Sequence, residues 1–510
     1  MPTERTSASG KNLRVSLLGQ LMTIIFNFAC RRIFLRLLGS ELTGFSGLCG
    51  HFLNFLSLAE PGFDAACIFS LYRPLAYGDT AAAARIMNYL KRVYRKISVL
   101  TFFLGLAALP LLLCFAKNGI SKSFAVSVYL VSLCDICLTY LFSHLRILPV
   151  ADQKSYVVSL VSYVFFIVSR LAGLVVLAKT HNYMLYLICS AVLGTIQELT
   201  IGNRVKRMYP YLVGSKDFSK GEERSEIISR VRPLFFHKLG AIMCGSVDNM
   251  AVFVYLGLHA GALYSNYTML SGICLTFISI ICASASASVG NLGVTSGRER
   301  MHTVFSTAYF AVFAIASFFA VSLFFTYPLI IELWVGGDMV LGLGETSLFC
   351  LFLLVFALRK PVGIFLDGFG LFDREKYKAL TEALLTLAIT VILAPRFGIS
   401  GVLAGQLLGT LCFSFWYEPY ILYKYGFKKE ISRFLMELPK YLFSFVMAFV
   451  LSAILCFCSR GLFDGLINIL FRFLVCGFST LSVYSIMFFD SKKFHEALRY
   501  SRRMAGRQRQ

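Results

Sequence analysis

Two adjacent cations interrupt an apolar stretch that is long enough to cross a membrane. Residues 348–372 read LFCLFLLVFALRKPVGIFLDGFGLF, with Arg359, Lys360 and Pro361 near the middle. A transmembrane helix needs roughly 20 apolar residues, and a charged side chain in hydrocarbon is costly unless it faces protein or water. Asp367 follows Lys360 by two helical turns, about 10 Å along the axis, so it cannot neutralise the lysine within one straight helix. We expect both cations to face other helices, a wet cavity or an anionic ligand.

Other ionisable residues inside apolar runs have simpler interpretations. Glu60 and Asp64 are four residues apart on one helical face, where like charges repel. One of them is then protonated, or both meet a cation, and a structural ion pair is as good an explanation as a role in coupling. Charges near span ends are first explained as anchors at the headgroups. Those near span ends are Arg31, Arg32, His237, Lys238 and Glu418.

Composition explains where these residues must lie. The 510-residue chain is 57% hydrophobic, only 15% charged, and has a mean hydropathy of +0.71. A soluble protein has about 25% charged residues, so we predict an all-α polytopic membrane protein with about 14 transmembrane helices. The predicted spans are 13–37, 43–71, 93–115, 122–147, 156–178, 183–205, 233–256, 261–289, 303–333, 347–371, 377–395, 400–423, 439–459 and 464–489.

The net charge of +22 is distributed as expected for a membrane protein rather than a nucleic-acid-binding protein. About 36 Lys and Arg fall in one set of alternating loops and about six in the other, which predicts cytoplasmic termini by the positive-inside rule. A weak internal sequence similarity at an offset of about 218 residues aligns Gly39 with Gly257. This similarity predicts a parallel repeat of six-helix lobes. The predicted parts are a cytoplasmic tail (1–12), an N-lobe (13–205), an inter-lobe loop (206–232), a C-lobe (233–425), two extra helices (426–490) and a basic cytoplasmic tail (491–510).

Motifs for bond chemistry are absent from the sequence. There is no phosphate-binding G-x-x-x-x-G-K-[ST] loop, no His-Glu-x-x-His metal motif and no Gly-x-Ser-x-Gly elbow. The cysteines lie mostly within apolar runs, where Cys packs as a small hydrophobe. We therefore expect a protein that is not an enzyme and uses no cofactor or metal.

Several stretches carry a resemblance to a known family. They are RRIFLRLLGSELTGFSGL leading to LNFLSLAEPGFDAACIFSLYRPLA, HKLGAIMCGSVDNM, RKPVGIFLDGFGLF, and GISGVLAGQLLGT leading to FWYEPYILYK. Together they resemble the polysaccharide (O-antigen or capsule repeat-unit) flippases of the multidrug/oligosaccharidyl-lipid/polysaccharide (MOP) exporter superfamily. Glu60-Pro61 departs from the family pattern, in which the second residue is usually not proline.

The resemblance implies two six-helix lobes around a central cavity, plus two extra helices, in a bacterial cytoplasmic membrane. It also implies a substrate of oligosaccharide units on undecaprenyl diphosphate, flipped from the inner to the outer leaflet, with a polysaccharide polymerase as a further partner. An anionic diphosphate needs cations along its path. The predicted diphosphate ligands are Arg359 and Lys360, with Arg31, Arg32 and Lys238 as weaker candidates; Asp367, Asp248, Glu60 and Asp64 are predicted to pair with these cations or to bind a coupling H⁺ or Na⁺.

Two alternatives remain open at the level of the sequence. A cation-coupled multidrug antiporter of the same superfamily would favour an acidic, aromatic cavity, against which the central cations argue. A non-transporting membrane scaffold for polysaccharide assembly would have no use for charges and prolines in mid-membrane.

Overall fold

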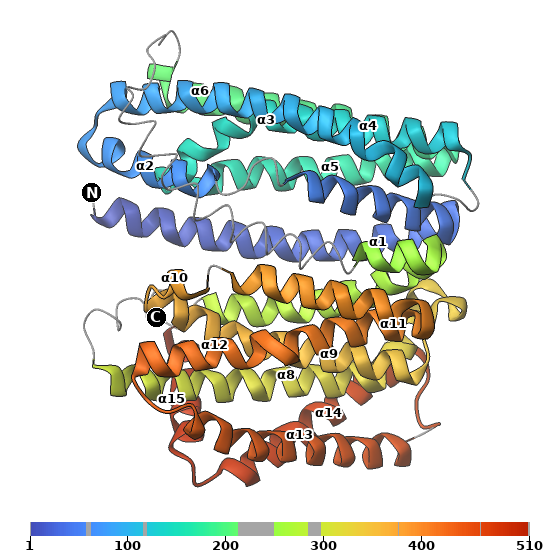
Figure 1. Ribbon diagram of the computed structural model, residues 1–510, viewed down its shortest axis with the longest axis vertical. Coiled ribbons are helices and arrows are strands. Elements are labelled where there is room, and N and C mark those ends of the chain that lie inside the picture. Colours follow the sequence, from blue (N-terminus) through green and yellow to red (C-terminus); the bar gives the residue numbers. More distant parts are fainter. Residues whose placement is uncertain are drawn as a thin grey trace. The chain divides into compact units, whose positions relative to one another are not determined.

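The computed structural model describes residues 2–57, 63–115, 120–212, 249–283, 297–375, 377–459 and 461–507. Within these segments the chain is helical apart from short connections, and they contain no strand (Figure 1). Ten helices in this part of the chain are long and apolar enough to cross a membrane. The chain is therefore a multi-pass helical membrane protein, which confirms the predicted fold class.

The chain divides into two compact units, Met1–Ala262 and Leu263–Gln510, called unit 1 and unit 2 below. The helices of unit 1 are α1 (Pro2–Leu56), α2 (Phe63–Tyr77), α3 (Thr80–Phe115), α4 (Lys122–Ala151), α5 (Ser155–Thr180) and α6 (Tyr183–Met208), followed by a 3₁₀ turn, η2 (Pro210–Leu212). The next described helical segment, Asn249–Ala283, begins in unit 1 and continues into unit 2.

Unit 1 is held together by the packing of its helices on one another, including consecutive helices and α1. Helix α3 packs on α4, α5 on α6, α4 on α6, and α1 on α5 (Figure 1). One apolar core joins Phe45 of α1, Tyr129 and Leu133 of α4 and Tyr183 of α6. The hydroxyl of Tyr129 donates to the carbonyl oxygen of Gly105 at 3.0 Å, so this large ring is buried without leaving its polar atom unpaired.

The longest uninterrupted helix among the described residues, Arg298–Val335, lies in unit 2. The described elements of unit 2 are α8 (Arg298–Val335), a 3₁₀ turn η3 (Gly337–Met339), α9 (Leu343–Gly368), α10 (Phe372–Glu375), α11 (Lys378–Gly409), a π-helical turn η4 (Thr410–Ser414), α12 (Phe415–Ile421), a second π-helical turn η5 (Leu422–Phe427), α13 (Ser432–Cys458), α14 (Gly465–Phe488) and α15 (Lys492–Arg507). Helix α8 packs on α9 and α14, α9 on α11, and α13 on α14.

Glycines with positive φ separate helices that follow one another directly. Gly39 in α1 has φ 76° and ψ 174°, Gly398 in α11 has φ 60°, and Gly257 has φ 85°. Each lies between two predicted spans, and Gly39 and Gly257 are the paired glycines of the predicted repeat. The long segments Asn249–Ala283 and Lys378–Phe427 therefore each contain parts of two predicted spans.

The remaining predictions about organisation are only partly covered. The first predicted span (13–37) and the start of the second (43–71) lie in α1, and the end of the second lies in α2; neither helix is among the ten candidates. The inter-lobe loop predicted at 206–232 is described only to residue 212. Cysteines in the described segments are all free thiols, in line with their predicted use in packing.

Candidate functional site

Arg359 on α9 lies at the centre of a buried network of ionic contacts in unit 2. Its Nη1 donates to Oε1 of Glu382 at 2.6 Å, and its Nη2 donates to Oε2 of the same carboxylate at 2.9 Å. Its Nη2 also donates to Oε1 of Glu418 at 2.6 Å, and its Nε donates to the same oxygen at 3.2 Å. The arginine side chain is 17% exposed and the two carboxylates 6% and 4%. One guanidinium thus holds two carboxylates from two other elements.

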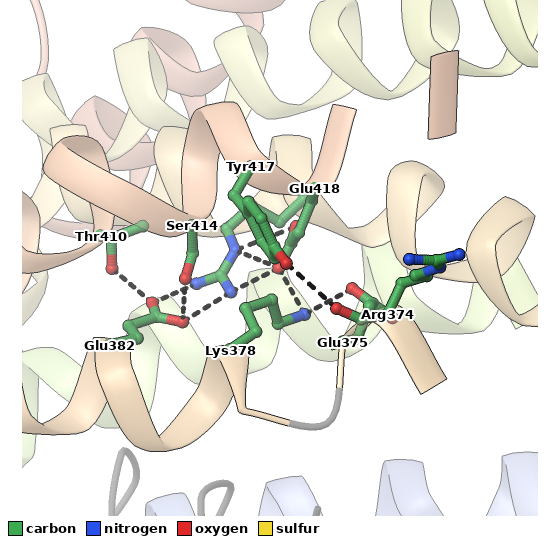
Figure 2. A network of polar contacts seen from close by, with 9 residues as sticks. Arg374, Glu375, Lys378, Glu382, Thr410, Ser414, Tyr417 and Glu418 are labelled. Atoms are coloured by element: carbon green, nitrogen blue, oxygen red, sulfur yellow. Dashed lines mark hydrogen bonds and ion pairs between the residues drawn. The ribbon is translucent and has the colours of Figure 1, made fainter. Parts of the chain in front are cut away.

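The π-helical turn η4 completes the environment of Glu382. Thr410 donates to Oε1 of this carboxylate at 2.8 Å, and Ser414 donates to Oε2 at 2.7 Å. Both hydroxyls come from η4, and Figure 2 shows them converging on the glutamate from one side. A π-helical turn widens the helix locally and is often found at functional sites. With two guanidinium and two hydroxyl donors, the carboxylate is fully hydrogen-bonded.

Lys378, at the start of α11, supplies the second cation of the network. Its Nζ lies 2.7 Å from Oε1 of Glu418 and 3.0 Å from Oε1 of Glu375 on α10. Lys378 and Glu382 are four residues apart, so they lie on the same face of α11. The network contains three carboxylates and two cations, which leaves one net negative charge when all five groups are ionised.

The ion pairs of Arg359 limit its ability to bind a phosphate in this structure. Its Nε, Nη1 and Nη2 already donate to carboxylates, and a guanidinium has only five N–H groups. Binding a phosphate through the same atoms would require Glu382 or Glu418 to give way. In this structure the side chain ties α9 to α11 and α12.

Lys360 has a different environment, although it is the next residue along α9. Successive residues of an α-helix are about 100° apart around the axis, so the two cations face different directions. Lys360 is exposed, and in the part of the chain that the structure describes it makes no hydrogen bond or ion pair. Asp367, two turns further along α9, is also exposed.

The candidate residues of unit 1 are held by different contacts. Arg31 is half-buried and donates from Nη2 to the carbonyl oxygen of Ala262 at 3.1 Å, whereas Arg32 is exposed. Asp64 is half-buried and accepts a hydrogen bond from the hydroxyl of the fully buried Tyr94. The remaining candidates, Glu60, Lys238 and Asp248, lie outside the described residues.

The structure therefore brings together residues that the sequence did not connect. Glu418 was interpreted as a group at a span end, yet its carboxylate is buried against Arg359 and Lys378. Glu382 lies within the predicted span 377–395. A signal was present: a buried arginine needs carboxylates, and the two spans after Arg359 contain Glu382 and Glu418. Among the described residues, no group of three or more His, Cys, Asp or Glu could hold a metal ion.

Comparisons with known proteins identify the fold. No protein-family model and no curated protein sequence matches the chain. Solved structures do match: the lipid II flippase MurJ in an inward closed conformation aligns with 94% of this chain and 99% of its own, with a TM-score of 0.70 and 13% identity. An inward-facing MATE family multidrug resistance transporter of the MOP superfamily aligns with 77% of this chain and 91% of its own, with a TM-score of 0.63 and 13% identity.

A MATE transporter of Vibrio cholerae gives a similar result. It aligns with 83% of this chain and 99% of its own, with a TM-score of 0.55 and 14% identity. The chain thus shares its fold with MurJ and with these MATE transporters.

Proposed function

We propose that this chain flips undecaprenyl-diphosphate-linked oligosaccharide repeat units from the inner to the outer leaflet of the bacterial cytoplasmic membrane, for surface polysaccharide synthesis. The observation that carries the proposal is the extent of the match to MurJ, which includes 94% of this chain. The two MATE transporters match 77% and 83% of it. A likeness over nearly the whole chain to a flippase of a lipid-linked substrate favours a substrate of that class over a small drug.

The chemistry of α9 supports an anionic substrate. A lipid-linked diphosphate must carry its charge through a low-dielectric layer, and cations along the path offset the loss of hydration. Lys360 is exposed and makes no ion pair with any described residue, so its ammonium is available to a phosphate. Arg359 takes part only if one of its two carboxylates releases it. Arg31, Arg32 and Lys238 remain secondary candidates.

In this proposal, transport proceeds by alternating access and is coupled to H⁺ or Na⁺. The acidic candidates for coupling or charge pairing are Asp367, Asp248, Glu60 and Asp64. A polysaccharide polymerase would take the flipped units as its substrate. All cytoplasmic steps of repeat-unit assembly would precede the action of this chain.

The second candidate function is a cation-coupled multidrug antiporter, which the MATE matches favour. Deleting the chain in its host and locating the lipid-linked repeat units distinguishes the two. Accumulation in the cytoplasmic leaflet is the expected result. An unchanged distribution with altered drug sensitivity would identify an antiporter, and an unchanged distribution with blocked polymer assembly would identify a scaffold.

A further inference from the structure

Unit 1 contains a cavity of its own, separate from the network on α9. It has a volume of about 490 Å³ and is lined by residues of α1, α4, α5 and α6. Sites for small ligands commonly measure about 300–1,000 Å³. The cavity thus has the size of a ligand site.

The cavity contains an arginine that forms no ion pair with any carboxylate in the described segments. Arg170 of α5 donates from Nη1 to the hydroxyl of Tyr186 at 2.7 Å, and its guanidinium carbon lies 5.2 Å from the centre of the Phe166 ring. No described carboxylate is within ion-pair distance of it. Its neighbour in the cavity wall, Arg146, has its Nε 3.1 Å from Oε2 of Glu198, so that charge is already paired.

Two carboxylates lie close to the cavity, and neither forms an ion pair with Arg170. Glu198 accepts hydrogen bonds from Arg146 and, at 3.4 Å, from Gln197. Asp135 lies against Gly194, a residue of the wall, and makes no ion pair with a described residue. A half-buried guanidinium inside a membrane span marks a functional site by default. Because its remaining N–H groups form a planar fork, an anionic oxygen pair is the matching ligand.

The rest of the lining is aromatic rings and hydroxyl groups. The hydroxyl of Tyr183 donates to Ser46 at 2.7 Å, and the rings of Tyr183 and Tyr186 are stacked 5.8 Å apart. The hydroxyl oxygen of Ser162 is buried without a hydrogen-bond partner in the described structure. Both tyrosine rings are buried in the core of unit 1, so the hydroxyl and amide groups of the wall are the groups that can bind sugar hydroxyls. Other polar members of the wall are Thr23, Ser169, Ser190 and Gln197.

We propose that this cavity binds an acidic sugar residue of the lipid-linked saccharide, with Arg170 contacting its carboxylate or phosphate and the hydroxyl and amide groups of the wall contacting its hydroxyls. The inference rests on the proposed function and deepens it, because it names the glycan as a second point of recognition besides the diphosphate. The same chemistry, an anion beside hydroxyl groups, occurs in the headgroup of phosphatidylglycerol. The experiment must therefore separate the two sources.

The test is a binding measurement on the purified full-length protein in nanodiscs of phosphatidylcholine. The probes are a disaccharide that contains glucuronate and the same disaccharide with its carboxyl group reduced to an alcohol, with binding measured by ligand-observed NMR. We expect the acidic probe to bind at least about tenfold more tightly than the reduced one, and Arg170→Gln to remove that difference. Lys179→Gln changes an exposed cation on the same helix outside the cavity and should leave binding unchanged.

Two further arms keep the test decisive if Arg170→Gln folds poorly. Ser190→Phe fills the cavity without removing charge and should abolish binding of both probes. Equal binding of the two probes to the wild type would overturn the proposal. So would nanodiscs of phosphatidylglycerol that displace the acidic probe, because they would assign the cavity to a lipid headgroup.

Binding is measured here without transport, so the two proposals can fail separately. A chain that binds the acidic disaccharide but moves no lipid-linked saccharide would refute the proposed function alone. A chain that flips lipid-linked units equally well with or without Arg170, and binds both probes alike, would refute only the assignment of the cavity.

Discussion

Replacing Arg359 by methionine removes the guanidinium that ties α9 to α11 and α12, while keeping a flexible, uncharged side chain. Glu382 then retains only its two hydroxyl donors, Thr410 and Ser414, and Glu418 retains Lys378. Removing one partner of a buried ion pair costs about 3–5 kcal/mol, because the other charge is left uncompensated. Because both carboxylates keep these other donors, we expect a loss of stability near the lower end of this range, about 3 kcal/mol. For a unit of this size that corresponds to a fall in Tm of roughly 6–12 °C.

The assay is thermal unfolding of the purified protein in detergent, followed with a thiol-reactive fluorophore. The fluorophore reacts with buried thiols as they become exposed on unfolding, and Cys350, which is buried on the same helix as Arg359, is one of them. All variants are heated at one scan rate, since unfolding of such a protein is expected to be irreversible and the midpoint then depends on rate.

A double variant separates charge from packing. Arg359→Met with Glu382→Gln should lose less stability than the sum of the two single changes, because the second change removes a charge that the first left unpaired. Arg396→Gln, an exposed cation on α11, is the matched control and should leave the Tm unchanged. If Arg359→Met unfolds at the wild-type temperature, the network does not hold these helices together and the reasoning fails.

Three further outcomes follow from the same structure. Lys360→Gln should abolish export of lipid-linked units while the Tm stays at the wild-type value, because the side chain is exposed and has no ion pair among the described residues; full export would remove it from the site. Gly39→Ala should cost about 1–3 kcal/mol in the same thermal assay, since φ 76° and ψ 174° suit only glycine. Gly50→Ala, at an exposed helical position of α1 with nothing within 4 Å of the added Cβ, should be neutral or slightly stabilising; equal effects at both glycines would contradict the argument from backbone conformation.

The fold could be predicted from the sequence because its main determinant is local. Hydrocarbon requires each span to satisfy its own backbone hydrogen bonds, so apolar runs of sufficient length become helices whatever they pack against. Even the breaks were visible, since Gly39, Gly257 and Gly398 each fall between two predicted spans. At these positions the sequence contains the residue that the backbone needs.

The network around Arg359 could be predicted only in part, because it depends on contacts between helices. The cost of burying a cation predicted that Arg359 needs partners, and this was correct. Which carboxylates supply them depends on the rotation of α11 and on the π-helical turn at Thr410–Ser414, and neither can be read from hydropathy. Arg359 and Lys360 were treated as a pair, yet adjacent residues of a helix face different directions.

Direct observation of flipping tests the central proposal most sharply. The purified chain is reconstituted into liposomes together with a fluorescent oligosaccharide on undecaprenyl diphosphate, and a membrane-impermeant reagent quenches the outer leaflet. We predict that label initially protected in the inner leaflet becomes accessible with the wild-type chain, and that Lys360→Gln slows this exchange strongly. Exchange no faster than in protein-free liposomes, under an imposed H⁺ or Na⁺ gradient of either direction, would contradict the account.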